Sequence, residues 1–308
     1  MHSRNRTTFR SGAAVLTLLL IIGTALPAKA LPQGSGQAQA GPEGGPPDNG
    51  PRLTLKQAGR DFLGDAGKIW SSPARIKTKH VLPIFALAAA TTFLIVSDRS
   101  IRDGIQTFAE KHAWVGDASS AITQLGGVAG FATAGAFFGA GLIFRDERAR
   151  DTGYMAASAI LQAFLVDNLL KSMTGRQRPF VADGEDHWAG PAAAYKRFGK
   201  DGSDLYGSFP SGHAAAAFSL ATVVALQYSR HAWVPVVAYT LAAGVGLSRM
   251  ALDRHWASDV AIGAVVGHLV ARLVVHDHGR RPRIIPTLAC SGRGLALSVF
   301  YDLDRAGR

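Results

Sequence analysis

The residues best suited to chemistry lie at the ends of apolar stretches, between positions 207 and 259. The segment GSFPSGHAAAAF runs from a short turn directly into an apolar stretch, and SRMALDRHWASD separates two further apolar stretches. Together the two segments place six residues at such ends: Ser211, Gly212, His213, Arg249, His255 and Asp259. Ionisable side chains beside apolar segments are costly unless they have a function. The two segments therefore predict half of an anion-binding catalytic site.

The other half is expected just after the third apolar stretch, which ends at Lys171. There KSMTGRQRPF places Arg176 and Arg178 beyond the stretch, and Pro179 stops any helix. In an antiparallel bundle, the ends of the third and fifth apolar stretches share a face with the starts of the fourth and sixth. This topology brings Lys171 and Arg178 to the same face as the six residues above.

One lysine and two arginines around the start of a helix suit a phosphate group, because Arg offers a fork of donors and Lys a point charge. At Ser211 and Gly212 the backbone N–H groups and the positive end of the helix dipole point at an anion. His255 and Asp259 are four residues apart, so the carboxylate can fix the imidazole tautomer. An oriented neutral histidine is a nucleophile or a base, which leaves His213 to act as an acid.

Each element taken alone also has a plainer interpretation. KSMTGRQRP is a basic flank of a membrane segment, His213 is a helix cap, and Asp259 is a charge that complements a helix dipole. Asp167 stands four residues before Lys171 and is expected to pair with it, with no catalytic role. The occurrence of all three blocks in order at helix ends favours a site over separate accidents.

The three blocks resemble the signature of the type 2 phosphatidic acid phosphatase superfamily. The blocks are Lys171 and Arg178-Pro179 with six residues between them, PSGH at 210–213, and Ser248-Arg249 followed by His255 and Asp259. That superfamily also holds bacterial class A acid phosphatases and vanadium-dependent haloperoxidases. The resemblance covers about residues 80–275 and implies six helices with the site at the extracytoplasmic face.

The resemblance also implies a role for each residue of the signature. His255 forms a phosphohistidine, Asp259 orients it, and His213 protonates the leaving alkoxide. The phosphoryl oxygens are bound by five residues: Lys171, Arg178, Ser211, Gly212 and Arg249. No metal and no other cofactor is implied, except vanadate if the chain is a haloperoxidase.

Composition and charge limit the classes of function that the chain can have. Its 308 residues are 47% hydrophobic and carry a net charge of +11. The arginines lie between apolar segments and not in a basic stripe with aromatic residues, which argues against nucleic-acid binding. Cys290 is the only cysteine, so the chain contains no internal disulfide.

Six apolar stretches predict an all-α fold, a six-helix antiparallel bundle. The stretches are 81–97, 121–144, 154–170, 213–228, 232–247 and 257–275. Arg-rich connections predict that the bundle is transmembrane, with the connections 98–120, 171–212 and 248–256 outside the cytoplasm. The alternative is a soluble periplasmic bundle, because periodicity alone does not separate the two cases.

Residues 80–275 form the predicted core, and the segments on either side of it are predicted separately. Residues 1–30 form a signal peptide or an uncleaved anchor, and 31–52 a disordered Gly/Pro linker. Residues 53–79 form an amphipathic helix that lies on a membrane surface or packs on the protein. A cleaved signal leaves residue 31 outside, whereas six spans require residues 53–80 inside, so one of these two predictions is wrong.

The tail 276–308 is basic, and its alternating residues predict a small β-hairpin. His276 and His278 resemble a metal pair, but no third ligand has an evident position, so the basic-tail interpretation is preferred.

The predicted function is hydrolysis of a phosphomonoester or pyrophosphate, on a lipid phosphate in the bacterial inner membrane, with the site facing the periplasm. The alternatives are a soluble periplasmic acid phosphatase, a haloperoxidase and a membrane protein that only binds an anionic headgroup. Selectivity is expected in the loop 182–207, through four aromatic residues: Trp188, Tyr195, Phe198 and Tyr206. The sequence leaves the oligomeric state open.

Overall fold

The computed structural model describes residues 55–181, 187–192, 205–280, 284–291 and 294–301. This part of the chain forms eight α-helices and two short 3-10 helices. The α-helices are α2 (Leu55–Trp70), α3 (Thr78–Lys111), α4 (Trp114–Ile122), α5 (Val128–Ile143), α6 (Glu147–Thr174), α8 (Gly212–Gln227), α9 (Trp233–Ala251) and α10 (Ala257–Arg280), and the 3-10 helices are η1 (Pro73–Arg75) and η2 (Thr123–Gly126). The predicted signal segment 1–30 and linker 31–52 lie outside the described residues.

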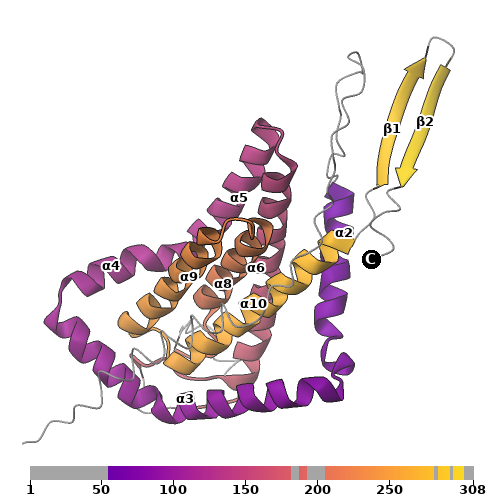
Figure 1. The fold of residues 1–308 in the computed structure, drawn as a ribbon. Helices are drawn as coiled ribbons and strands as arrows, with labels where there is room; N and C mark the ends of the chain where they lie inside the picture. Colours follow the sequence, from indigo (N-terminus) through magenta and orange to yellow (C-terminus); the bar gives the residue numbers. More distant parts are fainter. Residues whose placement is uncertain (1–54, 182–186, 193–204, 281–283, 292–293, 302–308) are drawn as a thin grey trace, which may run out of the picture.

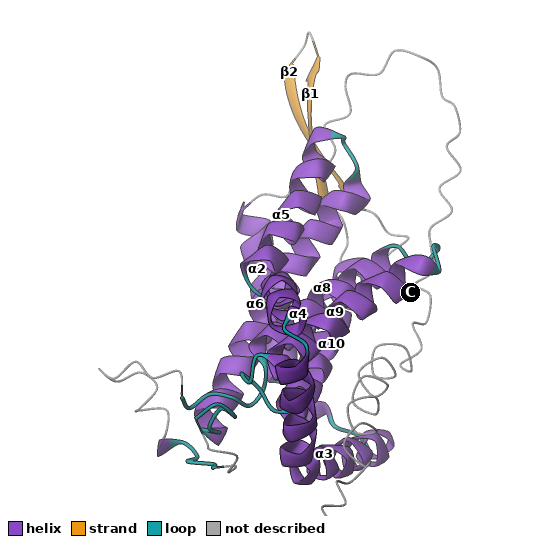
Figure 2. Cartoon of the chain, turned by 90° about the vertical axis from the view of Figure 1, so that its left-hand side faces the viewer, coloured by secondary structure: helices purple, strands orange, loops and turns teal. Residues whose placement is uncertain are grey.

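Helix α8 is the central element of the bundle. It packs against α6, α9 and α10, and α5 packs against α6 as a hairpin. Helix α3 crosses the lower end of these helices in Figure 1, and Figure 2 shows it again at the opposite end of the molecule from α5. Helix α8 is apolar on all sides, which is the pattern of a helix that is buried all round. Its packing against three other helices removes this apolar surface from the surroundings.

Helices α8 and α10 approach each other closely through small residues. A Cβ on Gly263 would lie 2.4 Å from the Ser211 carbonyl oxygen, and one on Gly267 would lie 2.1 Å from that of Ala215. These glycines stand four residues apart on α10, the small-xxx-small spacing that lets helices touch backbone to backbone. The contact fixes α10 against the start of α8, where the predicted site begins.

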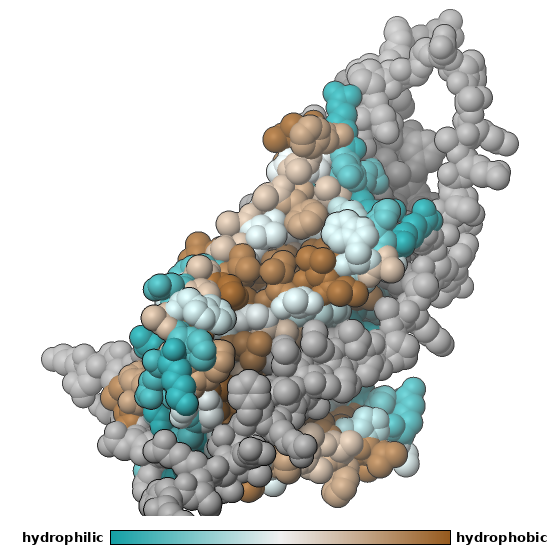
Figure 3. Space-filling model, turned by 60° about the vertical axis from the view of Figure 1, so that its left-hand side comes forward, coloured by the Kyte–Doolittle hydropathy of each residue, from teal (hydrophilic) through white to brown (hydrophobic). Residues whose placement is uncertain are grey.

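Helix α3 presents an apolar surface to the surroundings. Val81, Leu82, Phe85, Phe93 and Val96 are all more than half exposed, and only 6% of the residues in its most apolar 18-residue window are buried. Large exposed apolar surfaces mark contact with lipid or with a partner. Figure 3 shows apolar residues gathered between two hydrophilic groups on the visible face.

Four helices of the described part are long and apolar enough to cross a membrane: α3, α6, α9 and α10. The bent unit formed by residues 114–126 and α5, with an angle of 49°, would make a fifth. These helices identify the chain as an integral membrane protein.

The structure differs from the six predicted stretches in three places. The stretch 121–144 is broken by η2 and Gly127, and the stretch 81–97 belongs to one long helix that continues to Lys111 through the expected connection. The stretch 213–228 forms the 16-residue α8, which at 1.5 Å per residue is about 24 Å long against an apolar core of about 30 Å.

The amphipathic helix α2 packs on the body of the protein. Its Ile69 is buried in a cluster with α6, α8 and α10, and the Phe62 carbonyl accepts a hydrogen bond from Gln162 Nε2 at 2.8 Å. Lys68 forms an ion pair with Asp277 of α10. Of the two placements that the sequence allows for α2, the structure has the one on the protein.

Strands β1 (Ile284–Ser291) and β2 (Gly294–Tyr301) pair antiparallel beyond α10. The hairpin predicted for this tail stays a prediction, because the turn at 292–293 lies outside the described residues. His278 faces Asp151 of α6 at 3.6 Å. Among the described residues, no group of three or more His, Cys, Asp or Glu could hold a metal ion.

The α8–α10 contact predicts that Gly267→Ala destabilises the protein, because the added methyl group overlaps the Ala215 carbonyl. We expect a loss of roughly 1–3 kcal/mol, measured by thermal unfolding in detergent. The matched control is Gly139→Ala in α5, where a Cβ meets nothing within 4 Å and a small gain is expected. Equal stability of the two variants would contradict the close contact.

Candidate active site

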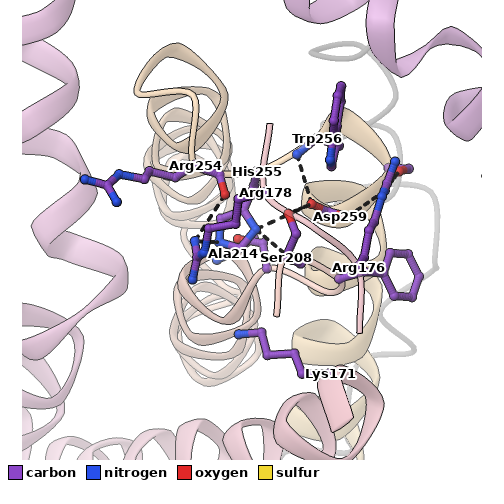
Figure 4. Close-up of polar contacts among 12 residues, drawn as sticks. Lys171, Arg176, Arg178, Ser208, Ala214, Arg254, His255, Trp256 and Asp259 are labelled. Atoms are coloured by element: carbon purple, nitrogen blue, oxygen red, sulfur yellow. Dashed lines mark hydrogen bonds and ion pairs between the residues drawn. The ribbon is translucent and has the colours of Figure 1, made fainter. Parts of the chain in front are cut away.

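The predicted site residues gather where α6 and α9 end and α8 and α10 begin. Lys171 lies in the last turn of α6 and Arg249 in the last turn of α9, whereas Ser211 caps α8 and Asp259 lies in the first turn of α10. Figure 4 shows the Lys171 amine directed towards Arg178, Ser208 and His255. The antiparallel topology expected from the sequence is thus the one that positions these residues.

His255 is held by its Nδ1 atom. Nδ1 lies 2.7 Å from the Ser208 carbonyl oxygen and 3.5 Å from Asp259 Oδ2. Because a carbonyl oxygen only accepts, Nδ1 carries the proton and Nε2 has the lone pair. Nε2 lies 3.4 Å from Arg178 Nη1. The ring therefore presents an unprotonated nitrogen beside a guanidinium group.

Asp259 has a wider role than the expected contact with His255. Its Oδ2 accepts hydrogen bonds from Ser208 Oγ at 2.5 Å and from the Trp256 N–H at 2.9 Å, and its Oδ1 accepts one from Arg176 at 2.6 Å. Of the two acceptors near His255 Nδ1, the Ser208 carbonyl at 2.7 Å is closer than Asp259 Oδ2 at 3.5 Å. Asp259 fixes the segments on both sides of the ring.

The surroundings of His255 favour its neutral form. Burial lowers the pKa of His255 most, the hydrogen bond to Asp259 raises it, and the positive charges of Arg178 and Lys171 lower it further. The resulting pKa is about 3, against an ordinary value of 6.5. The imidazole is therefore unprotonated throughout the neutral pH range.

The start of α8 lies against the end of α6. Ser211 Oγ accepts from the Ala214 N–H at 3.5 Å, and the Ser211 N–H donates to the Asp259 carbonyl at 3.0 Å. A Cβ on Gly212 would lie 3.1 Å from Asp167 Oδ2 and 3.3 Å from Lys171 Nζ. A methyl group here would press on the Asp167–Lys171 ion pair, which measures 2.7 Å as its spacing predicts.

The bend between α4 and α5 completes this end of the bundle. Arg249 Nη1 donates to Thr123 Oγ1 at 3.0 Å, and a Cβ on Gly127 would lie 3.4 Å from His213 Nε2. On Gly126 it would lie 2.6 Å from the His213 carbonyl oxygen. The second apolar stretch is thus broken where its backbone packs against the predicted acid.

Several residues of the site were not among those predicted: Asp98, Thr123, Arg176, Ser208 and Trp256. The Gly126-Gly127 pair inside an apolar stretch was a readable signal of the bend at Thr123. Arg176 was visible in the sequence, but nothing there separates its role from that of Arg178.

Two of the four aromatic residues expected to control selectivity have structural contacts. The Trp188 ring lies 4.6 Å from the Arg176 guanidinium, and the Tyr206 hydroxyl accepts from Gln177 Nε2 at 3.1 Å. Tyr195 and Phe198 lie outside the described residues, so their expected role stays a prediction.

Comparison with known families adds to this geometry. Residues 152–283 match the PAP2 superfamily model, and all eight predicted site residues fall within the matched segment. The match assigns this segment of the chain to the PAP2 superfamily. Helix α3, with Asp98, and the bend at Thr123 lie outside the matched segment.

Two proteins that resemble this chain have names that state an activity. A protein of Porphyromonas gingivalis named lipid A 1-phosphatase is 54% identical over 67 residues, which are 21% of this chain and 15% of that protein. The chain therefore matches about one seventh of that relative's length. A solved structure, the transmembrane PAP2-type phosphatidylglycerolphosphate phosphatase of Bacillus subtilis, aligns with a TM-score of 0.47 and 25% identity, over 63% of this chain and 92% of that one.

The low pKa of His255 predicts a loss of stability in acid. Between about pH 6.5 and pH 3 the unfolded chain binds a proton on this residue and the folded protein does not, so stability falls as the pH is lowered through that window. His255→Gln should therefore lose less stability between pH 7 and pH 4.5, by about 2 kcal/mol. Thermal unfolding in detergent at the two pH values measures the difference, and equal losses would contradict the low pKa.

Proposed function

We propose that this protein is a metal-independent phosphatase that removes a phosphate group from a membrane lipid. The observation that carries the proposal is the unprotonated Nε2 of His255 beside Arg178, with the opposite ring nitrogen bonded to a backbone carbonyl. An imidazole in this tautomer can attack phosphorus, and the adjacent guanidinium can bind the oxygens of the same group.

Binding of the phosphoryl group falls to the cations and to the start of α8. Lys171 and Arg178 come from the end of α6 and the loop behind it, and Arg249 comes from α9. The Gly212 N–H, in the first turn of α8, has no acceptor within the helix. The Ser211 N–H is already bonded to the Asp259 carbonyl, so Ser211 contributes as the cap of the helix. Together they oppose the negative charge that spreads over the phosphoryl oxygens in the transition state.

The reaction then proceeds in two displacements. His255 Nε2 forms a bond to phosphorus as the bond to the ester oxygen breaks, and His213 gives that oxygen a proton. A water molecule next attacks the phosphohistidine, His213 accepts its proton, and inorganic phosphate leaves. Asp259 and the Ser208 carbonyl keep the His255 ring in position through both steps.

A lipid substrate is favoured over a soluble one by the exposed apolar surface of α3. A periplasmic enzyme acting on soluble esters would have no use for a 34-residue helix with exposed Val, Leu and Phe side chains. The relative named lipid A 1-phosphatase and the solved phosphatidylglycerolphosphate phosphatase make these two lipids and phosphatidic acid the first substrates to test.

The loop charges support an extracytoplasmic site in the inner membrane. Arg145, Arg148 and Arg150 lie in and after the turn between α5 and α6, at the opposite end of α6 from Lys171. Basic residues favour the cytoplasmic side of a membrane. The site would then face the periplasm and receive lipids from the outer leaflet.

We expect His255→Ala to abolish phosphate release from a lipid phosphate, because the nucleophile is lost. The assay uses the purified protein in detergent with lipid A, phosphatidylglycerol phosphate and phosphatidic acid in parallel. His231→Ala, which removes an exposed histidine between α8 and α9, is the matched control and should keep full activity. Undiminished turnover by a folded His255→Ala variant would overturn the proposal.

A further inference from the structure

We propose that Arg176, together with Asp98 of α3, is a positioning unit for His255, an inference that rests on the proposed phosphatase function. The unit does not touch phosphate. It holds the carboxylate of Asp259, through which it fixes the ring of the nucleophile.

Arg176 is fully buried, and its guanidinium donates to side chains of α3 and of the start of α10. Nη1 donates to Ser258 Oγ and to Asp259 Oδ1, both at 2.6 Å, and Nη2 donates to Asp98 Oδ2 at 2.8 Å. The rings of Trp188 and Trp256 lie 4.6 and 5.2 Å from the guanidinium carbon, within the range of cation–π attraction. A buried charge is stable only when it is paired and hydrogen-bonded, and Arg176 has both kinds of partner.

Asp98 reaches the start of α10 from a different helix. Its Oδ1 accepts from the Ser258 N–H at 2.9 Å, and its Oδ2 accepts from Ser258 Oγ at 2.5 Å. A carboxylate that accepts N–H groups in the first turn of a helix acts as a cap. Asp98 therefore anchors α10 while it also holds Arg176.

Two connections lead from Arg176 to the His255 ring. The first runs through the side chain to Asp259, whose Oδ2 accepts from Ser208 Oγ. The second runs through the backbone, because the Arg176 carbonyl accepts from the Ser208 N–H at 3.0 Å. Ser208 is thus held at both ends, and its own carbonyl accepts the proton of His255 Nδ1.

Arg176 and Arg178 have different partners although they stand two residues apart. Arg178 bonds to the Arg254 carbonyl and lies beside His255 Nε2, where a phosphate would bind. Figure 4 shows Arg178 on one side of Ser208 and Arg176 on the other, next to Asp259. One arginine of KSMTGRQRP thus serves the substrate and the other serves Asp259.

Helix α3 is fixed near the unit by further contacts. Arg102 donates to both carboxylate oxygens of Asp253, at 2.7 and 2.6 Å, and Gln106 Nε2 donates to the Met250 carbonyl at 3.0 Å. Gln106→Ala therefore weakens the docking of α3 without touching the Asp98–Arg176 unit. It is the matched control for loss of α3 packing alone.

The experiment compares Arg176→Lys, Asp98→Asn, their double variant and Gln106→Ala in the full-length protein in detergent. Steady-state hydrolysis of the best lipid phosphate gives kcat and KM, and orthovanadate inhibition reports oxyanion binding. We expect kcat to fall roughly 10- to 100-fold in both single variants, a size typical of lost orienting partners. KM and the vanadate inhibition constant should change less than about twofold, because the phosphate ligands are intact.

The double variant should be no slower than the slower single variant, because both changes break one unit. Gln106→Ala should keep kcat within about twofold. A raised KM or weaker vanadate inhibition with kcat retained would make Arg176 a phosphate ligand and overturn the proposal. Independent, additive losses in the double variant would also overturn it.

A second readout does not depend on turnover. Nitrogen-15 NMR of histidine-labelled protein reports the His255 tautomer, with the signal assigned by its absence in His255→Gln. We expect the Nδ1–H form in the wild type and in Gln106→Ala, and a mixture of tautomers in Asp98→Asn and Arg176→Lys. An unchanged tautomer in these two variants would overturn the positioning role. A wild type that releases no phosphate would defeat the proposed function alone, because the NMR comparison would still test the unit.

Discussion

The buried carboxylate of Asp259 is the constraint on which this site depends. A carboxylate removed from water must be paired and hydrogen-bonded, and the donors that satisfy it come from three parts of the chain: Arg176 from the loop after α6, Ser208 from the turn before α8, and the Trp256 N–H from the start of α10. By gathering these donors, Asp259 determines where His255 lies and which of its nitrogens is protonated. The orientation of the His255 ring follows from the requirement to satisfy one buried charge.

Small residues make this arrangement compatible with a bundle in a membrane. Apolar burial gives helices little reason to associate in lipid, so they associate through close packing and hydrogen bonds. Gly263 and Gly267 let α10 touch the backbone of α8, and Gly212 leaves room for the Asp167–Lys171 pair. The polar site lies at the end of the bundle, where helix termini supply donors that have no partner within their own helices.

The long helix α3 has an apolar exposed half and a half that makes polar contacts beside the site. Its first half exposes Val81, Phe85 and Phe93, whereas its second half uses Asp98 and Arg102 to hold the turns on either side of His255. One helix therefore carries both the exposed apolar surface and the polar contacts beside the site. This helix lies outside the segment that matches the PAP2 superfamily.

The sequence by itself predicted which residues gather and the end of the bundle at which they do so. Lys171, Arg178, His213 and His255 follow from spacing, and antiparallel helices bring alternate ends together. Only the tertiary structure showed that the second stretch bends at Gly126-Gly127 against His213 and that α8 is short and enclosed. Tertiary structure also decided that Arg176 serves Asp259 while Arg178 faces Nε2. Arg176 and Arg178 are the same residue type two positions apart, so the sequence does not separate their roles. Their roles differ because their partners, such as Asp98 on another helix, come from distant parts of the chain.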